Sequence, residues 1–175
     1  MKMYITQLRG VFEKVSQENE DVLEEAGRRL AQTIASDGQI FVHDFSPIPL
    51  LSMEATKSEN TLPNVQPLLN DEATKQLSER DLLLLYLQKD YEDEAIRLIK
   101  SVKPSGAQII GILSADIIDP FGDLFDACLT VPVSEPLIPF DDFGKMGHPE
   151  SLTLLFTYHL LYFSVMEIVS EQALL

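Results

Sequence analysis

The spacing of apolar residues changes abruptly about one fifth of the way along this chain. In residues 1–36, apolar positions recur at intervals of three and four, which is the spacing of one face of a helix. This pattern predicts two N-terminal helices. The second would run from about Asp21 to a stop near Gly38, since glycine is favoured just beyond a helix end.

Short, nearly continuous apolar runs then replace the helical spacing. They occupy residues 39–43, 82–87, 107–113 and 127–132, and such runs are typical of strands buried on both faces of a parallel sheet. Helical spacing returns between the second and third runs, at residues 95–99. Ser46 and Pro47 suit the N-cap and first position of a further helix, and residues 64–69 suit a short edge strand.

Together these patterns predict one α/β domain, a three-layer flavodoxin-like sandwich with a parallel sheet. N-terminal helices occupy residues 1–36, the sheet core residues 38–133, and a C-terminal helix residues 149–172. Residues 133–146, rich in Pro and Gly, are expected to be irregular. Ligands of such sheets bind beyond the carboxyl ends of the strands, so chemistry is expected in the polar loop 88–94.

The closing helix is apolar on nearly every face and approaches the length of a membrane span. It also contains His159 and Glu167, and no Lys or Arg follows Lys145 to give a positive flank. Helices of this kind are more often buried in a core or a subunit interface. We therefore expect a homodimer interface and no membrane partner.

Composition narrows the classes of partner. The chain has 13 basic and 28 acidic residues among 175, a net charge of −15, which argues against binding nucleic acid. One cysteine, Cys128, excludes an intrachain disulfide, and the N-terminus lacks a signal peptide's apolar segment, so a cytoplasmic location is expected. No spacing predicts a metal site, and no cofactor motif occurs, so neither is expected.

Three segments resemble the sugar isomerase (SIS) domain, and in particular phosphoheptose isomerases. They are residues 38–43, similar to the family's first strand, residues 81–100, similar to its second strand, serine loop and helix, and residues 106–112 with 126–130, similar to its later strands. The resemblance implies a phosphosugar-binding fold and a C-terminal dimer helix. It covers roughly residues 21–169.

Both phosphate-binding loops depart from the family pattern. The loop after the second central strand reads Leu87-Gln-Lys-Asp-Tyr-Glu92 where the family has a Ser-x-Ser-Gly-x-Thr loop. No Ser or Thr hydroxyl remains there, and the acids of residues 90–94 oppose a phosphate dianion. The first loop carries Pro47 and Pro49, which have no N–H to donate. Ser46, Ser52, Gln88, Lys89 and Ser114 stay as candidate ligand-binding residues.

The resemblance also suggests catalytic residues. Phosphoheptose isomerases use a Glu on the helix after the first loop and a His on the closing helix, and Glu54 and His159 are the counterparts here. An acid and a base of this kind serve aldose–ketose isomerisation. His43, near the end of the first strand, is a further candidate for the ligand site. The sequence leaves two functions open, a sugar-phosphate isomerase and a non-catalytic binding or regulatory module derived from the SIS fold.

Overall fold

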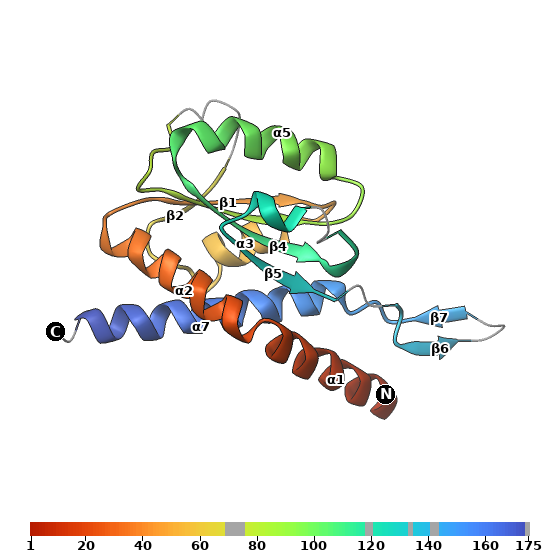
Figure 1. Ribbon diagram of the computed structural model, residues 1–175. Helices are drawn as coiled ribbons and strands as arrows, with labels where there is room; N and C mark the ends of the chain where they lie inside the picture. Colours follow the sequence, from red (N-terminus) through yellow and green to blue (C-terminus); the bar gives the residue numbers. More distant parts are fainter. Residues whose placement is uncertain (69–75, 118–120, 133–134, 141–143, 174–175) are drawn as a thin grey trace.

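The computed structural model describes residues 1–68, 76–117, 121–132, 135–140 and 144–173. Its centre is a five-stranded sheet in the order β2-β1-β3-β4-β5, and every neighbouring pair is parallel (Figure 1). The expected α/β fold is confirmed. The strands are β1 (Ile40–Phe45), β2 (Val65–Pro67), β3 (Leu82–Leu87), β4 (Gln108–Ser114) and β5 (Ala127–Val131).

Helices cover both faces of this sheet. On one face lie α2 (Glu20–Ala35), α3 (Leu50–Lys57) and α7 (Glu150–Ala173), and on the other lies α5 (Glu92–Val102) (Figure 1). The N-terminal helix α1 (Lys2–Glu18) extends beyond the sheet, beside a separate hairpin. Short 3₁₀ turns η1 (Lys103–Ser105), η2 (Ala115–Ile117) and η3 (Gly122–Leu124) complete the described elements.

Side chains alternate between two hydrophobic cores, as the period of two along a strand requires. In β3, Leu82, Leu84 and Tyr86 face α2, α3 and α7, whereas the residues between them face α5. All six residues of β3 are buried, which explains why this strand is a continuous apolar run rather than an alternating one.

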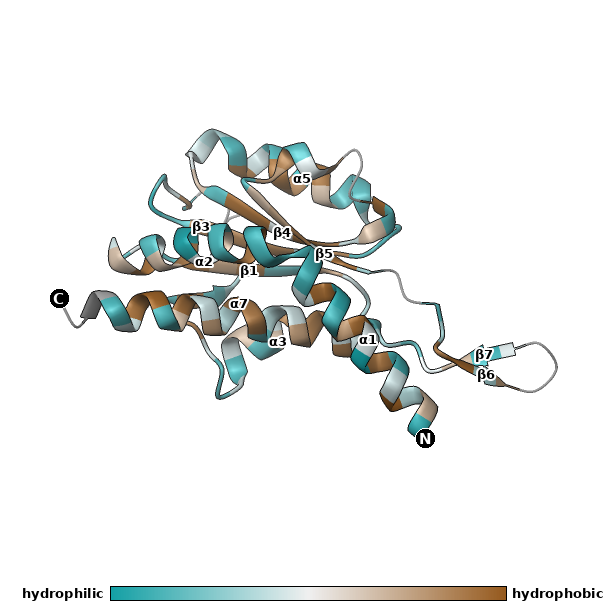
Figure 2. Ribbon diagram, turned by 60° about the horizontal axis from the view of Figure 1, so that its bottom comes forward, coloured by the Kyte–Doolittle hydropathy of each residue, from teal (hydrophilic) through white to brown (hydrophobic). Residues whose placement is uncertain are grey.

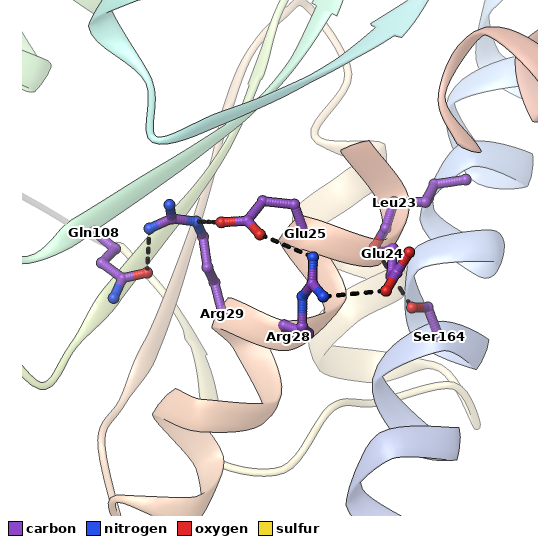
Figure 3. Close-up of polar contacts among 7 residues, drawn as sticks. All are labelled: Leu23, Glu24, Glu25, Arg28, Arg29, Gln108 and Ser164. Atoms are coloured by element: carbon purple, nitrogen blue, oxygen red, sulfur yellow. Dashed lines mark hydrogen bonds and ion pairs between the residues drawn. The ribbon is translucent and has the colours of Figure 1, made fainter. Parts of the chain in front are cut away.

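Helices α2 and α7 approach closely because Gly27 has no side chain. A Cβ at Gly27 would lie 2.3 Å from the Ser164 hydroxyl, and that hydroxyl donates a 3.4 Å hydrogen bond to the Leu23 carbonyl (Figure 3). On the other side of α2, Arg29 contacts Glu25 at 2.8 Å and the Gln108 side chain at 3.2 Å (Figure 3). These polar contacts connect α2 to both α7 and β4.

A buried asparagine joins the α1–α2 junction to the edge strand β5. The Asn19 amide donates to the carbonyls of Val15 at 2.8 Å and Thr130 at 2.9 Å, and its side-chain oxygen accepts from the Thr130 N–H at 2.6 Å. Only 1% of Asn19 is exposed. The side chain therefore takes the place that a neighbouring strand would occupy beside Thr130.

Two local predictions are wrong. Residues 133–146 were expected to be irregular, but β6 (Ile138–Phe140) and β7 (Gly144–Met146) form an antiparallel hairpin. Helix α3 begins at Leu50 rather than at Pro47, and Ser46 does not cap it, because the Ser46 hydroxyl donates to the Ile48 carbonyl at 2.8 Å.

Helix α7 is long and apolar enough, by length and composition alone, to cross a membrane. One face of α7 is buried in the core against the sheet, through Leu154, Tyr158, Leu161 and Val165. Figure 2 shows the mixture of apolar and polar residues along this helix. The buried apolar residues of α7 belong to the core of the α/β fold, whereas Phe163 is 61% exposed.

Candidate functional site

A small cleft of about 130 Å³ lies where β1 and β3 end and α7 begins. This is the edge of a parallel sheet at which ligands are expected. The loop after β1, the end of β3 and the first turns of α3 and α7 all contribute to its wall. The lining residues are Ser46, Pro47, Ile48, Leu50, Tyr86, Gln88, Glu150, Ser151 and Leu154.

Glu150 is the centre of the hydrogen bonding in this cleft. Its Oε1 atom accepts from the Tyr86 hydroxyl at 2.8 Å and from the Ser114 hydroxyl at 3.5 Å, and its Oε2 atom accepts from the Gln88 side-chain amide at 3.1 Å. Donors from the ends of β3 and β4 thus converge on one carboxylate in the first turn of α7. A carboxylate is also favoured at this position by the helix dipole.

Asp44 provides a second carboxylate close by. It is the register partner of Tyr86 on the neighbouring strand, at the same face of the sheet. Its two oxygens accept from the backbone N–H groups of Leu51 at 2.9 Å and Ser52 at 2.8 Å, and from the Ser52 hydroxyl. Asp44 therefore accepts the first N–H groups of α3, which the sequence pattern assigned to Ser46 as the N-cap.

The pKa values of both Asp44 and Tyr86 are raised at this site. Burial raises the pKa of Asp44, against the opposing influence of its hydrogen bonds to Ser52 and Leu51. Burial, and then the hydrogen bond to Glu150, raise the pKa of Tyr86 far above its ordinary value. Tyr86 therefore stays a neutral hydroxyl that donates to Glu150, and it does not serve as a base.

Glu54 and His159, the two predicted catalytic residues, are in direct contact. The His159 Nε2 atom lies 2.9 Å from the Glu54 Oε1 atom, and the Asn60 amide lies 3.2 Å from that oxygen and 3.4 Å from the His159 nitrogen. The hydrogen bond to His159 is the main reason why the pKa of Glu54 is lowered. Side-chain exposures of 37% for His159 and 21% for Glu54 leave the pair accessible.

This pair stands beside the cleft and is not part of its lining. Leu50 and Leu154 line the cleft, Glu54 follows one helical turn after Leu50 on α3, and His159 follows five residues after Leu154 on α7. The Tyr158 hydroxyl donates to the Asn60 carbonyl at 2.6 Å, which fixes Asn60 between the two helices.

The other predicted ligand-binding residues are distributed unevenly. Ser46 and Gln88 line the cleft. Ser114 and Ser52 do not line it, but their hydroxyls donate hydrogen bonds to Glu150 and Asp44 respectively. His43 belongs to the alternate residues of β1 that face α5, and its ring packs edge-on against Phe45, so it lies across the sheet from Glu54 and His159.

Lys89 is not among the residues that line the cleft. Its ammonium lies 3.8 Å from the Asp116 carboxylate, and 63% of its side chain is exposed. In the described ranges, no group of three or more His, Cys, Asp or Glu side chains is arranged to hold a metal ion. Asp44, Tyr86 and Glu150, by contrast, were not predicted as site residues.

Comparison with solved structures shows which fold this is. The structure superimposes on the sugar isomerase domain of an RpiR transcription factor from Sphaerobacter thermophilus with a TM-score of 0.65 and 13% identity, covering 99% of this chain and 95% of that one. Phosphoheptose isomerase from Neisseria gonorrhoeae gives 0.60 at 12% identity, covering 91% and 94%. These likenesses show an SIS-type fold.

A third similar structure is the C-terminal domain of glucosamine-fructose-6-phosphate aminotransferase from Francisella tularensis, with a TM-score of 0.61, 12% identity and 94% of this chain covered. The chain spans only 44% of that protein's length. By sequence, the chain belongs to the family described as a domain of unknown function, DUF2529, whose model matches residues 1–169. It is 28% identical over 175 residues to protein YwjG of Bacillus subtilis (strain 168), covering 99% of both chains.

Proposed function

We propose that this protein is an SIS-fold module that binds a carbohydrate derivative in the cleft between Ser46, Tyr86 and Glu150. The single observation that carries the proposal is the position of the cleft. It opens at the carboxyl ends of the two central strands β1 and β3, where parallel sheets bind their ligands. Polar groups converge there on a largely apolar wall, as in small-molecule sites generally.

Similarity to sugar-related proteins supports carbohydrate as the ligand class. The similar structures include a sugar isomerase domain from a transcription factor and a phosphoheptose isomerase. A binding or regulatory role fits the cleft best, because its lining contains no histidine, lysine or arginine among the described residues. Glu150, its one acid, already accepts hydrogen bonds from Tyr86, Gln88 and Ser114.

Blocking the cleft tests the proposal. Ser151 is exposed and lies at the cleft in the first turn of α7, so Ser151→Tyr would fill part of the space. Ser170→Tyr is a matched control, because Ser170 is also an exposed serine on α7 but lies at the other end of the helix. A panel of sugars and sugar phosphates would be screened by NMR titration. We expect binding that Ser151→Tyr abolishes and Ser170→Tyr preserves, and equal binding by both variants would refute the cleft as the site.

A second candidate function is aldose–ketose isomerisation of the phosphoheptose isomerase type. It is favoured by one observation, the 2.9 Å contact between Glu54 and His159, which could act as base and acid toward a sugar. Against it, the lowered pKa of Glu54 makes this carboxylate a weaker base than one poised near neutral pH.

An isomerase assay separates the two candidates. The substrates would be aldose and ketose phosphates, and the variants Glu54→Gln and His159→Gln keep side-chain size while removing acid–base function. Turnover that both variants abolish would establish the catalytic role. Binding without turnover in the unaltered protein would leave the non-catalytic module as the function.

A further inference from the structure

We propose that the cleft selects an unphosphorylated carbohydrate, and that the Glu150 carboxylate is the residue that determines this specificity. The inference rests on the proposed carbohydrate-binding function and adds the chemical class of the ligand. It follows from a count of hydrogen-bond donors and charges around the cleft.

The first donors of α3 are already occupied. The N–H groups at the start of a helix are the usual backbone donors for a phosphate. Here those of Leu51 and Ser52 donate to the Asp44 carboxylate, at 2.9 and 2.8 Å. The N–H of Leu50 donates to the Ile48 carbonyl at 2.8 Å, and that of Met53 donates to the Pro49 carbonyl at 3.0 Å. A phosphate at this helix would have to displace the chain's own carboxylate.

The side-chain donors on the opposite wall are occupied in the same way. The hydroxyls of Tyr86 and Ser114 and the amide of Gln88 all point to Glu150. A carboxylate has about four acceptor positions, of which these bonds use three. The oxygens of Glu150 and of the Ser46 and Ser151 hydroxyls can still accept hydrogen bonds, which suits the hydroxyl or amino groups of a sugar.

Charge leads to the same conclusion. Asp44 and Glu150 place two carboxylates around Tyr86, and among the described residues that line the cleft there is no Lys, Arg or His to offset them. Lys89, the nearest cation in sequence, contacts Asp116 at 3.8 Å. A phosphate dianion in the cleft would face these like charges, whereas the hydroxyl or amino groups of a free sugar would donate to Glu150.

Matched pairs of sugars test the inference. D-glucose and D-glucosamine would be compared with their 6-phosphates by NMR titration of the full-length protein, since each pair differs only in the phosphate. We expect the free sugars to bind at least about tenfold more tightly than their phosphates. A phosphate that binds as tightly as its free sugar, or more tightly, overturns the inference but leaves the proposed function intact. If no member of the panel binds, both are overturned.

Two variants assign the selectivity to its residue. Glu150→Gln keeps the shape of the side chain and removes its charge, so we expect free-sugar binding to weaken and the preference against phosphate to fall by about tenfold. Glu92→Gln is the control, because Glu92 begins α5 as Glu150 begins α7 but does not line the cleft. Thermal unfolding would verify that both variants fold. A preference unchanged in folded Glu150→Gln refutes the role of this carboxylate.

Discussion

Replacing Asn19 by alanine should destabilise the protein strongly, although Asn19 is not among the residues that line the cleft. The substitution removes three hydrogen bonds, to Val15 O and to the N–H and carbonyl of Thr130, from a residue that is 99% buried. Each bond contributes about 1 kcal/mol net, and leaving buried partners unpaired raises the cost. We therefore expect the free energy of unfolding to fall by about 3–4 kcal/mol.

Urea denaturation followed by circular dichroism measures this change. Asn19→Asp is an informative second variant, because it retains the oxygen that accepts from the Thr130 N–H but loses both donated bonds. The exposed neighbour Glu20 gives a control through Glu20→Ala, for which we expect a change within about 0.5 kcal/mol. A loss below about 1 kcal/mol for Asn19→Ala would refute the role of Asn19 as a structural link between the α1–α2 junction and β5.

Three further predictions concern other parts of the molecule. Because the folded-state pKa of Glu54 is lowered, its stabilising effect should be complete above the ordinary pKa of a glutamate and be lost as the pH falls through the lower folded value. Unfolding at several pH values should show the advantage over Glu54→Gln shrinking as the pH drops below the ordinary pKa of a glutamate, and a constant difference would contradict this. Burial raises the pKa of Cys128 to about 12, so its thiol should react with a disulfide reagent at pH 8 more than tenfold more slowly in the folded than in the urea-unfolded protein, and equal rates would disprove this. We expect a homodimer by light scattering at micromolar concentration, with Phe163→Glu shifting it toward monomer because Phe163 is 61% exposed on α7; a monomeric mass for the unaltered protein would rule the dimer out.

The sheet could be predicted from the sequence because its central strands are buried on both faces. Such burial requires continuous apolar runs, and residues 82–87 and 108–113 satisfy this requirement without ambiguity. Glu54 and His159 were predicted as catalytic residues only through the family resemblance, and their direct contact was not predicted, since they lie 105 positions apart in the sequence. Spacing within the chain carries no signal for a contact of this kind.

The edge of the sheet at which the cleft lies, and its lining residues Ser46 and Gln88, were predicted from the sequence. The acids Asp44 and Glu150 were not, because both have ordinary local explanations. Glu150 is a typical acid in the first turn of a helix, and Asp44 is the fifth residue of a strand. Their roles depend on β1, β3 and α7 meeting at one edge. The hairpin formed by Ile138–Phe140 and Gly144–Met146 was missed for a related reason, since two prolines and two glycines in residues 136–147 favour irregular structure locally.

A crystal structure of the protein soaked with D-glucosamine would test the central claim most directly, namely that the cleft at the ends of β1 and β3 is the ligand site. We predict the sugar in that cleft, with a hydroxyl or amino group about 3 Å from a Glu150 carboxylate oxygen. A sugar bound elsewhere, with the cleft left unoccupied, would contradict the account.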